Sequence, residues 1–310
     1  MIKVLVLGSK GMLGSMVHRV LSHSMDIKVM GTSRSTEDTH HSGPGWRLPF
    51  RAEDPVTLCR TLPLSGGWPD FIINCIGRIK PTIHPDDPHS VANAIVANAV
   101  LPHRLAAMAA DLSTCRIIHI TTDCVFSGRV GGYTESAPHD ADDHYGKTKS
   151  LGEVVADNVM NLRCSIIGPE LSRPTRSLME WVIGQKLGAN ILGYSNHLWN
   201  GLTTLHFAHI CQGLVTHDHL FRAGTQHLVP QDLVTKFGLL QWIARAWGRE
   251  DITVEAIAHS QDFNMTLNTR FPDQNAALWN VSGYPVPPTI DQMVRELAEF
   301  CGAVTLPPIT

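Results

Sequence analysis

Tyr145 and Lys149 are the side chains of this 310-residue sequence best suited to proton transfer. They are four positions apart, and on a helix side chains at that spacing lie on one face. A nearby ammonium group favours the ionised phenol and lowers its pKa from about 10. Tyr145 could then donate a proton to a carbonyl oxygen, or remove one in the reverse direction. Lys149 could also hydrogen-bond the ribose of a nicotinamide cofactor.

The spacing of this pair is also compatible with a lysine-rich surface helix, so its context matters. An apolar segment from Cys115 ends in the hydroxyls of Thr121 and Thr122. Thr122 can hydrogen-bond the same carbonyl oxygen that Tyr145 protonates, although paired threonines also commonly cap strand ends. A hydroxyl, a tyrosine and a lysine in this order after a glycine loop are together much more specific than any one of them. We therefore predict Thr122, Tyr145 and Lys149 as the catalytic residues.

A glycine loop comes directly after the apolar run Ile2–Leu7. Gly8 permits a sharp turn out of the strand, Gly11 lets a pyrophosphate approach the backbone, and Gly14 allows close helix–strand packing. The N-terminus of the following helix offers free N–H groups to phosphates. A tight turn without a ligand would need only part of this pattern. The predicted cofactor-binding residues of the loop are Gly8, Ser9, Lys10, Gly11, Met12, Leu13 and Gly14.

Arg34 occupies the end of the second strand, where NAD-binding folds usually place an acidic residue that holds the ribose 2′-hydroxyl. A guanidinium suits a 2′-phosphate, and Lys10 adds positive charge nearby. Arg34 as a solvated loop residue is the competing interpretation. The pattern favours NADPH as the cofactor, with NADH as the alternative.

The elements that must position these residues alternate between strand and helix patterns. Parallel strands need crossover helices, so this alternation predicts an α/β fold with a doubly wound parallel sheet, the Rossmann type. We expect residues 1–168 to form an NADP-binding Rossmann domain. Residues 169–310 should form mainly a smaller C-terminal substrate-binding lobe, and the return of some of its elements to the sheet stays open. Strands are predicted at Ile2–Leu7, Ile27–Met30, Phe71–Cys75, Cys115–Thr121 and Met160–Ile167, helices at Gly11–Ser22, Pro55–Leu62, Ser90–Leu112, Tyr145–Asn158, Leu178–Leu187, Thr204–Thr216, Leu233–Trp247 and Ile290–Phe300, and a loop at Ser35–Phe50.

Charge and composition exclude several classes of function. The formal net charge is −3, which gives no strong attraction to nucleic acid or to an anionic membrane surface. No window contains the roughly 20 apolar residues that a membrane span needs. The seven cysteines are odd in number, form no CxxC pair and follow no export signal, so we expect reduced thiols in a cytoplasmic protein. The 17 histidines are spaced irregularly, and no metal site is predicted.

Three stretches of the sequence resemble one enzyme family, the dTDP-4-dehydrorhamnose reductases. The stretches are Thr121-Thr122-Asp123-Cys124-Val125-Phe126-Ser127-Gly128, Tyr133-Thr134-Glu135, and Tyr145-Gly146-Lys147-Thr148-Lys149-Ser150-Leu151-Gly152-Glu153. The resemblance implies an extended short-chain dehydrogenase fold and the same three catalytic residues. It also implies that the cofactor is lined by Cys75, Ile76, Gly77, Asn98 and Ile166. The implied reaction is reduction of the C4 ketone of a 4-keto-6-deoxy sugar nucleotide by NADPH.

The sequence also departs from this family. The family's tyrosine after the aspartate is Cys124 here, and the segment from Trp199 differs, which leaves the sugar and the nucleotide open. Cys124 also stands where sugar-nucleotide dehydratases carry a glutamate, which argues against dehydration. Candidate substrate contacts are Lys80, Asp123, Cys124, Trp199 and Asn200, with a core role as the alternative for Trp199. An epimerase with the same triad and a non-catalytic NADP-binding regulatory subunit stay open, and a homodimer is among the possible oligomeric states.

Overall fold

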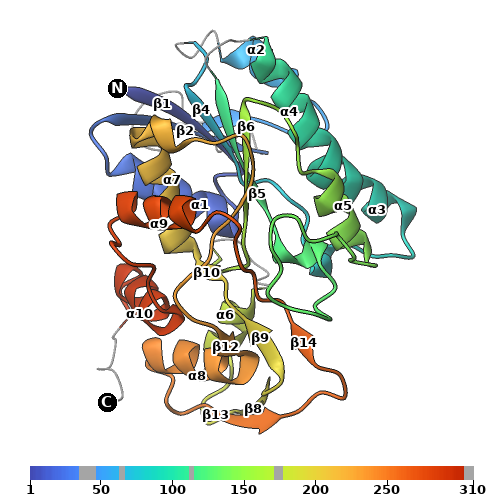
Figure 1. Cartoon of the computed structure of the whole chain (residues 1–310), viewed down its shortest axis with the longest axis vertical. Helices are drawn as coiled ribbons and strands as arrows, with labels where there is room; N and C mark the ends of the chain where they lie inside the picture. The colour runs from blue at the N-terminus through green and yellow to red at the C-terminus, as the bar shows by residue number, and fades with distance from the viewer. Residues whose placement is uncertain (35–46, 63–66, 112–114, 171–176, 304–310) are drawn as a thin grey trace.

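A central parallel sheet organises the molecule (Figure 1). The computed structural model describes residues 1–34, 47–62, 67–111, 115–170 and 177–303. Within these residues the sheet has seven strands in the order β11-β6-β5-β4-β1-β2-β3. Every neighbouring pair is parallel, which confirms the predicted doubly wound α/β fold. The strands are β1 (Ile2–Leu7), β2 (Ile27–Ser33), β3 (Arg47–Pro49), β4 (Phe71–Asn74), β5 (Arg116–Thr121), β6 (Val159–Arg163) and β11 (Gly224–His227).

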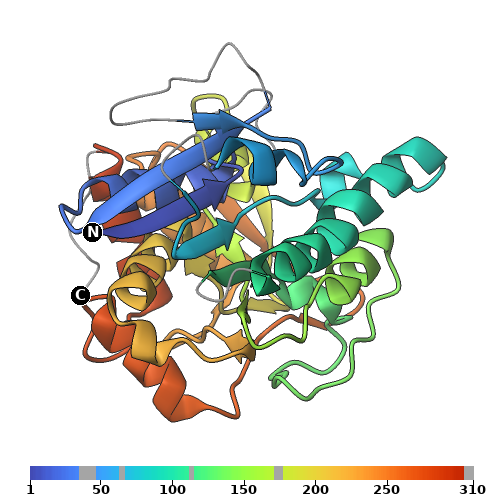
Figure 2. The same ribbon diagram turned by 90° about the horizontal axis from the view of Figure 1, so that it is seen from above.

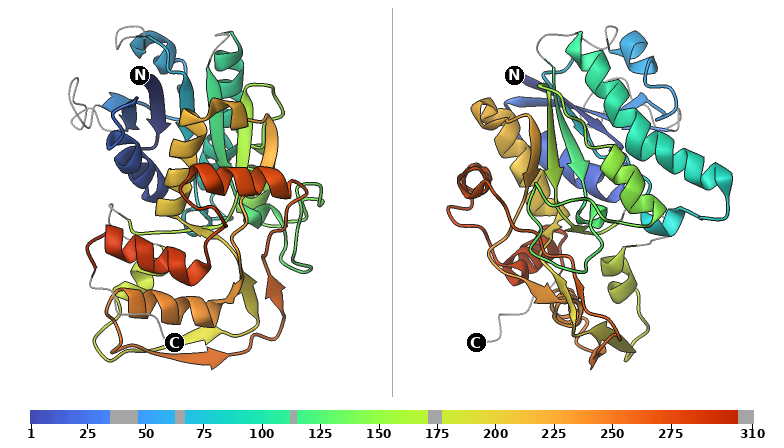
Figure 3. Two further views of the ribbon diagram at one scale, coloured as in Figure 1. Left: turned by 60° about the vertical axis from the view of Figure 1, so that its left-hand side comes forward. Right: turned by 45° about the vertical axis from the view of Figure 1, so that its right-hand side comes forward.

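Helices cover both faces of the sheet (Figures 2 and 3). Parallel strands are buried on both faces, which explains the continuous apolar sequence of β1 and β4. One face carries α1 (Met12–Ser22) and α7 (Thr204–Thr216), which pack against each other. The opposite face carries α2 (Thr57–Thr61), α3 (Pro88–Ile95), α4 (Leu101–Ala110) and α5 (His144–Leu151), with the short π-helical turn η3 (Val96–Val100) between α3 and α4.

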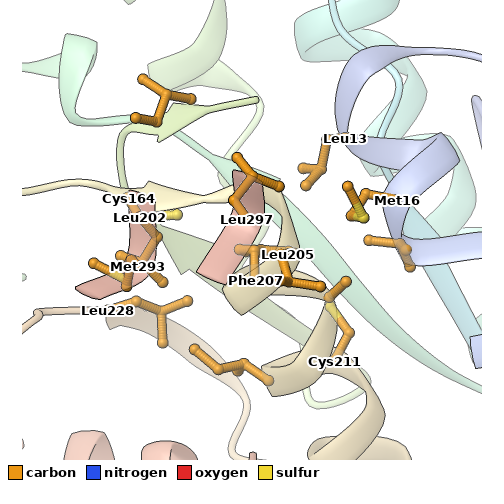
Figure 4. Packing of buried hydrophobic residues seen from close by; sticks show 14 of the residues in the cluster. Leu13, Met16, Cys164, Leu202, Leu205, Phe207, Cys211, Leu228, Met293 and Leu297 are labelled. Atoms are coloured by element: carbon orange, nitrogen blue, oxygen red, sulfur yellow. The ribbon is translucent and has the colours of Figure 1, made fainter. Parts of the chain in front are cut away.

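Elements from the second half of the chain also belong to the central sheet and to the helices on one of its faces. Strand β11 pairs with β6 and extends the sheet at its edge, and α7 covers one face of the sheet. Figure 4 shows how Leu13 and Met16 of α1 face the side chains of Leu205 and Cys211 of α7 across one apolar cluster. The cluster continues to Leu297 in α10 (Ile290–Phe300), so one core joins the sheet to the C-terminal elements.

The remaining C-terminal elements lie beyond the carboxyl ends of the sheet strands (Figure 3). They form three small sheets, which pair β7 with β10, β8 with β13, and β9 with both β12 and β14. The strands are β7 (Ile166–Ile167), β8 (Asn190–Tyr194), β9 (His197–Trp199), β10 (Leu202–Thr203), β12 (Val234–Thr235), β13 (Thr253–Ile257) and β14 (Phe263–Asn264). The helices of this region are α6 (Leu178–Ile183) and α8 (Lys236–Ala246), whereas α9 (Pro272–Val281) lies beside the sheet and packs against α7. The 3₁₀ turns η2 (Lys80–Thr82), η4 (Asp123–Val125) and η5 (Asp218–Leu220) lie elsewhere in the chain.

Several predicted elements are shorter or more divided than expected. The helix predicted to reach Asn158 ends at Leu151, and Gly152 forms its C-cap. A Cβ on Gly152 would lie 1.9 Å from the Asn98 carbonyl oxygen, so only glycine fits there. The strand predicted at Met160–Ile167 is divided into β6 and β7. Residues 35–46 of the predicted loop lie outside the described residues, and β3 follows them. No helix in the described ranges is long and apolar enough to cross a membrane.

Candidate active site

The glycine loop connects β1 to α1 with the geometry that its spacing predicts. Gly8 has φ +77°, a conformation that favours glycine, and its carbonyl accepts the Gly11 N–H at 2.9 Å. A Cβ on Gly14 would lie 2.3 Å from the Gly8 carbonyl oxygen, so only glycine fits where the helix meets the loop. A Cβ on Gly11 meets only ordinary contacts, and Gly11 is exposed. The loop therefore presents open backbone at the N-terminus of α1, as a pyrophosphate site requires.

Ser9 has a structural role within the loop. Its side chain is buried, its hydroxyl donates to the Thr32 carbonyl at 3.0 Å, and it accepts from Arg47 Nε at 3.2 Å. The Thr32 hydroxyl in turn accepts the Gly8 N–H at 3.0 Å. These bonds hold the loop to the end of β2, so Ser9 can meet a ligand through its backbone only.

Two arginines lie at the strand ends beside this loop. Arg34 follows β2 and is exposed to solvent. Arg47 begins β3, where it pairs in register with Gly31 of β2. Sequence inspection did not single out Arg47, because only the pairing of β3 with β2 brings it to Ser9. Arg34 and Arg47 together supply the positive charge that a 2′-phosphate would need.

The loop after β4 meets the glycine loop between β1 and β4, where the strand order reverses. A Cβ on Gly8 would lie 3.0 Å from the Ile76 side chain and 3.4 Å from the Cys75 carbonyl oxygen. In doubly wound sheets, ligands bind at this switch point beyond the carboxyl ends of the strands. Cys75 and Ile76 are half-buried and Gly77 is exposed, so all three border that position. Ile166, predicted to pass the cofactor, is half-buried in β7 and pairs with Leu202.

Asn98, which was predicted to line the cofactor, connects two parts of the site through its side-chain amide. It is fully buried in the π-helical turn η3. Its side-chain Oδ1 accepts the Arg78 backbone N–H at 2.7 Å. Its side-chain Nδ2 donates to the Arg78 backbone carbonyl and to the Thr148 hydroxyl, both at 3.0 Å. These bonds use the amide and connect the loop after β4 to α5, which carries Tyr145 and Lys149.

The three predicted catalytic residues lie at the carboxyl end of β5 and on the helix beside it. Thr122 follows β5, is nearly buried, and donates its hydroxyl to Asp123 Oδ1 at 3.0 Å. Tyr145 and Lys149 lie on α5, whose N-terminus is capped by Asp143 through the Gly146 N–H at 2.8 Å. A hydrogen bond links Tyr145 to Thr122. Lys149 Nζ donates to the Ile120 carbonyl at 2.7 Å, which pins α5 to the end of β5.

Burial dominates the ionisation of this group. It raises the pKa of Tyr145 well above the usual value, against the opposing effect of the Thr122 hydrogen bond. Burial lowers the pKa of Lys149 to about 8, against the charge of Glu153. The expected lowering of the Tyr145 pKa is therefore not observed, because loss of hydration is the largest influence on the phenol and the nearby charges of Cys124, Asp123 and Asp143 act in the same direction. Tyr145 is protonated at neutral pH, the state that a proton donor requires.

Three predicted substrate contacts gather beside Tyr145. Lys80 forms an exposed ion pair with Asp143 at 2.8 Å, and Cys124 contributes to raising the Lys80 pKa after the larger effects of the Asp143 hydrogen bond and charge. Asp123 is buried, and burial raises its pKa. Cys124 Sγ lies 3.5 Å from Asp123 Oδ1, and burial raises the pKa of this thiol as well. The region therefore combines a buried carboxylate and a largely buried thiol with an exposed ion pair next to Thr122.

Trp199 and Asn200, the other two predicted substrate contacts, are buried and engaged by other parts of the protein. Trp199 is only 2% exposed and belongs to the apolar core, so its ring presents no open face to a sugar or base. Asn200 exchanges two hydrogen bonds of 2.8 Å with the backbone of Leu267. The sequence could not show the packing of Trp199 or the hydrogen bonds of Asn200, because both depend on residues from other parts of the chain.

Lys236 is a residue that sequence inspection missed. It begins α8, and its ammonium group lies 5.0 Å from the centroid of the Trp199 ring. Burial lowers its pKa, and the negative charge of Asp123 opposes this effect. The same charge interaction opposes the raised pKa of Asp123. Lys236 thus brings a cation from the second half of the chain to the residues that follow Thr122.

No group of three or more His, Cys, Asp or Glu side chains that could hold a metal ion occurs in the described ranges. The seven cysteines form no disulfide, and they include Cys75 and Cys124 at the candidate site.

The candidate site as a whole offers a phenol as a proton donor, a hydroxyl that can hold a carbonyl oxygen, and a lysine on the same helix as the phenol. The glycine loop adds a backbone site for phosphates.

Comparisons with solved structures support the fold. A dTDP-4-dehydrorhamnose reductase from Clostridium acetobutylicum superposes with a TM-score of 0.73 at 17% identity, covering 97% of this chain and 100% of that chain. The Bacillus anthracis reductase in complex with NADP gives 0.68 at 16% identity, covering 96% and 98%. A dTDP-glucose 4,6-dehydratase from the same organism in complex with NAD gives 0.70 at 16% identity, covering 97% of both chains. At these identities the likeness shows the fold alone.

Sequence comparisons place the chain in a family. Comparison with curated protein sequences gives no match. The family model described as the RmlD substrate binding domain matches residues 2–167, which is more than half of the chain and includes the glycine loop, Thr122, Tyr145 and Lys149. The chain therefore belongs to the RmlD substrate binding domain family.

Proposed function

We propose that this protein is an enzyme that uses NADPH to reduce the C4 ketone of a 4-keto-6-deoxy sugar nucleotide. The observation that carries the proposal is the grouping of Thr122, Tyr145 and Lys149 at the carboxyl end of β5, on the side of the sheet where the glycine loop opens. Residues 1–168 would bind the cofactor, and residues 169–310 would supply most of the substrate lobe.

Cofactor binding follows from the loops at the switch point. The backbone of residues 8–14 and the N-terminus of α1 would hold the pyrophosphate. Arg34 and Arg47 would bind the 2′-phosphate of NADPH, and Lys149 the nicotinamide ribose. Cys75, Ile76, Gly77 and Ile166 would line the site. When bound, the nicotinamide supplies the hydride.

Proton transfer falls to the side chains of this chain. Tyr145 donates its proton to the C4 oxygen, because burial keeps the phenol protonated until a charge develops on that oxygen. Thr122 holds the same oxygen by exchanging its hydrogen bond with Asp123 for one to the substrate. Both groups stabilise the alkoxide as it forms, so their contribution is to the transition state.

Substrate recognition would use both halves of the chain. Asp123 can accept a hydrogen bond from a sugar hydroxyl, and Cys124 borders the same space. Lys236, on the other side, can donate to a sugar oxygen, and Lys80 lies at the exposed end of the site. The ring of Trp199 would pack against the Lys236 ammonium group and would not stack on the ligand.

The test is a single-turnover assay of NADPH oxidation with a panel of 4-keto sugar nucleotides, followed by NMR of the product. We expect stoichiometric loss of NADPH absorbance and a new secondary alcohol at C4. A change of configuration without net NADPH loss would indicate the epimerase alternative. No reaction with any member, despite NADPH binding, would favour the regulatory subunit and overturn the proposal.

A further inference from the structure

Two carboxylates in the sequence motifs have no place in the proposed mechanism. Glu135 follows Tyr133 and Thr134, and Glu153 ends the segment that begins at Tyr145. Both accept several hydrogen bonds, and both belong to one network behind the end of β5. The centre of that network is Arg163, the last residue of β6, which is 1% exposed.

Glu153 fixes the end of α5 to the catalytic edge of the sheet. Its Oε1 accepts from the Thr121 hydroxyl at 2.8 Å and from Arg163 Nε at 2.9 Å, and its Oε2 forms an ion pair with Arg163 Nη2. Lys149, four positions earlier, donates to the adjacent Ile120 carbonyl. Lys149 and Glu153 therefore hold α5 to consecutive residues of β5, directly before Thr122.

The other N–H groups of Arg163 fix its position from further parts of the chain. Nη1 donates to His227 Nε2 in β11 at 2.7 Å, and Nη2 donates to His139 Nε2 at 2.8 Å. The guanidinium carbon lies 5.1 Å from the centroid of the Phe126 ring. Since arginine only donates, both histidines must be neutral acceptors here. Arg163 is thereby held rigidly and cannot follow Glu153 if that side chain moves.

Glu135 completes the network at a distance from the catalytic residues. It accepts from the His227 N–H at 3.0 Å, the Thr269 hydroxyl at 2.6 Å and the Arg270 N–H at 2.8 Å. None of these three partners lies on α5 or β5. Glu135 and Glu153 thus carry the same charge within one network, but only Glu153 contacts the elements that hold Lys149.

We propose that Glu153, locked by Arg163, is a positioning residue that keeps Lys149 charged and fixed behind Tyr145. The inference deepens the proposed function, because it assigns Glu153 to the support of the same catalytic lysine. It predicts that the charge of Glu153 matters separately from its hydrogen bonds.

The groups around Lys149 explain why Glu153 is needed. Lys149 interacts with Glu153, with the thiols of Cys75 and Cys164, and with His119 in β5. Burial raises the pKa of both thiols and lowers that of His119 well below its usual value, so these three groups are neutral at pH 7. Burial also acts to raise the pKa of Glu153, but Arg163 and Thr121 hold it below the usual value. Among these four neighbours, only Glu153 then carries the charge that offsets the burial of Lys149.

The experiment measures NADPH affinity against pH by fluorescence titration, which needs no turnover. Wild-type affinity should fall as the pH rises through about 8, where Lys149 loses its proton. Glu153→Gln keeps an acceptor for Thr121 but removes the charge, and should move this midpoint down by about one pH unit or more. Lys149→Arg should remove the midpoint, because arginine stays charged. Glu135→Gln is the matched control and should leave the midpoint unchanged while lowering stability in urea.

The double variant Glu153→Gln/Arg163→Met guards against misfolding of Glu153→Gln, since it leaves no unpaired guanidinium in the core. It should show a downward shift that is smaller than that of Glu153→Gln, because the positive charge of Arg163 is removed together with the carboxylate. An unshifted midpoint in both Glu153 variants, or a wild-type affinity without a midpoint near pH 8, would overturn the inference. Failure of the wild type to bind NADPH at any pH would instead overturn the proposed function.

Discussion

Thr122 and Asn200 are each 7% exposed and each follow a short strand, yet they occupy regions with different roles. Two hydrogen bonds of Thr122 join it to Asp123 and Cys124, its immediate neighbours. Those of Asn200 go to Leu267, from a distant part of the chain. A local bond can be exchanged for one to a substrate, whereas loss of a long-range bond releases a segment of the fold. For these two residues, equal burial thus accompanies different roles, and the difference lies in what their hydrogen bonds hold together.

The substitution with the largest expected effect is Tyr145→Phe, on α5 beside the end of β5. Loss of the phenol should slow single-turnover reduction about 10²–10⁴-fold, because general acid catalysis supplies a factor of that size. NADPH affinity and the urea midpoint should stay close to wild type, since the ring still packs. Tyr194→Phe, on exposed β8, is the control and should react at the wild-type rate. A Tyr145→Phe enzyme of near wild-type rate would disprove the role of this residue.

In the supporting region, Trp199→Ala should act on stability instead. Removing a buried indole leaves a cavity and costs about 3–5 kcal/mol of the free energy of unfolding. Urea denaturation measures this loss, with Trp181→Ala as the control because Trp181 is half exposed on α6. Equal stability of the two variants would show that Trp199 is free to bind ligand after all.

Acid should weaken the network at the sheet edge through His227. Burial, and then Arg163, lowers the pKa of His227 to about 4 in the folded chain, below the value of about 6.5 expected when unfolded. The neutral form therefore stabilises the fold fully above pH 6.5, and about 3 kcal/mol should be lost as the pH falls to 4. His227→Gln retains an acceptor for Arg163 and should reduce this dependence. An unchanged profile of unfolding free energy against pH in the variant would contradict the assignment.

Arg34→Ala should weaken binding of NADPH about 10- to 100-fold and leave binding of NADH unchanged, because only the 2′-phosphate loses a charge-assisted contact. Isothermal titration with both cofactors measures the effect, and exposed Arg60→Ala on α2 serves as the control. Equal wild-type affinity for the two cofactors would remove the basis for preferring NADPH.

The smallest expected effect is that of Lys236→Met, which connects the two regions. The variant keeps a long side chain against Trp199 but loses the cation, so we expect KM for the sugar nucleotide to rise about tenfold with a lesser change in kcat. Steady-state kinetics would measure both constants, with exposed Lys186→Met as the control. A fall in kcat alone would mean that Lys236 acts on Asp123 and not on the substrate.

The sequence by itself determined the parallel sheet, the glycine loop and the Tyr145–Lys149 pair. In a βα unit the strand period, the turn and the helix period follow from residues that are close in the chain, so spacing predicts which side chains share a face or an edge. This locality explains why Gly8, Gly14 and Thr122 lie at the strand and helix ends where their pattern places them.

Only the tertiary structure decided the roles that depend on distant partners. Arg47 reaches Ser9 through β3, Lys236 reaches Asp123 from α8, and Arg163 joins α5 to β11. Only the tertiary structure also shows that Asn98, Trp199 and Asn200, which were predicted to contact ligands, are already engaged by other parts of the chain. No spacing rule encodes these contacts, since each arises from the packing of elements that are far apart in the sequence.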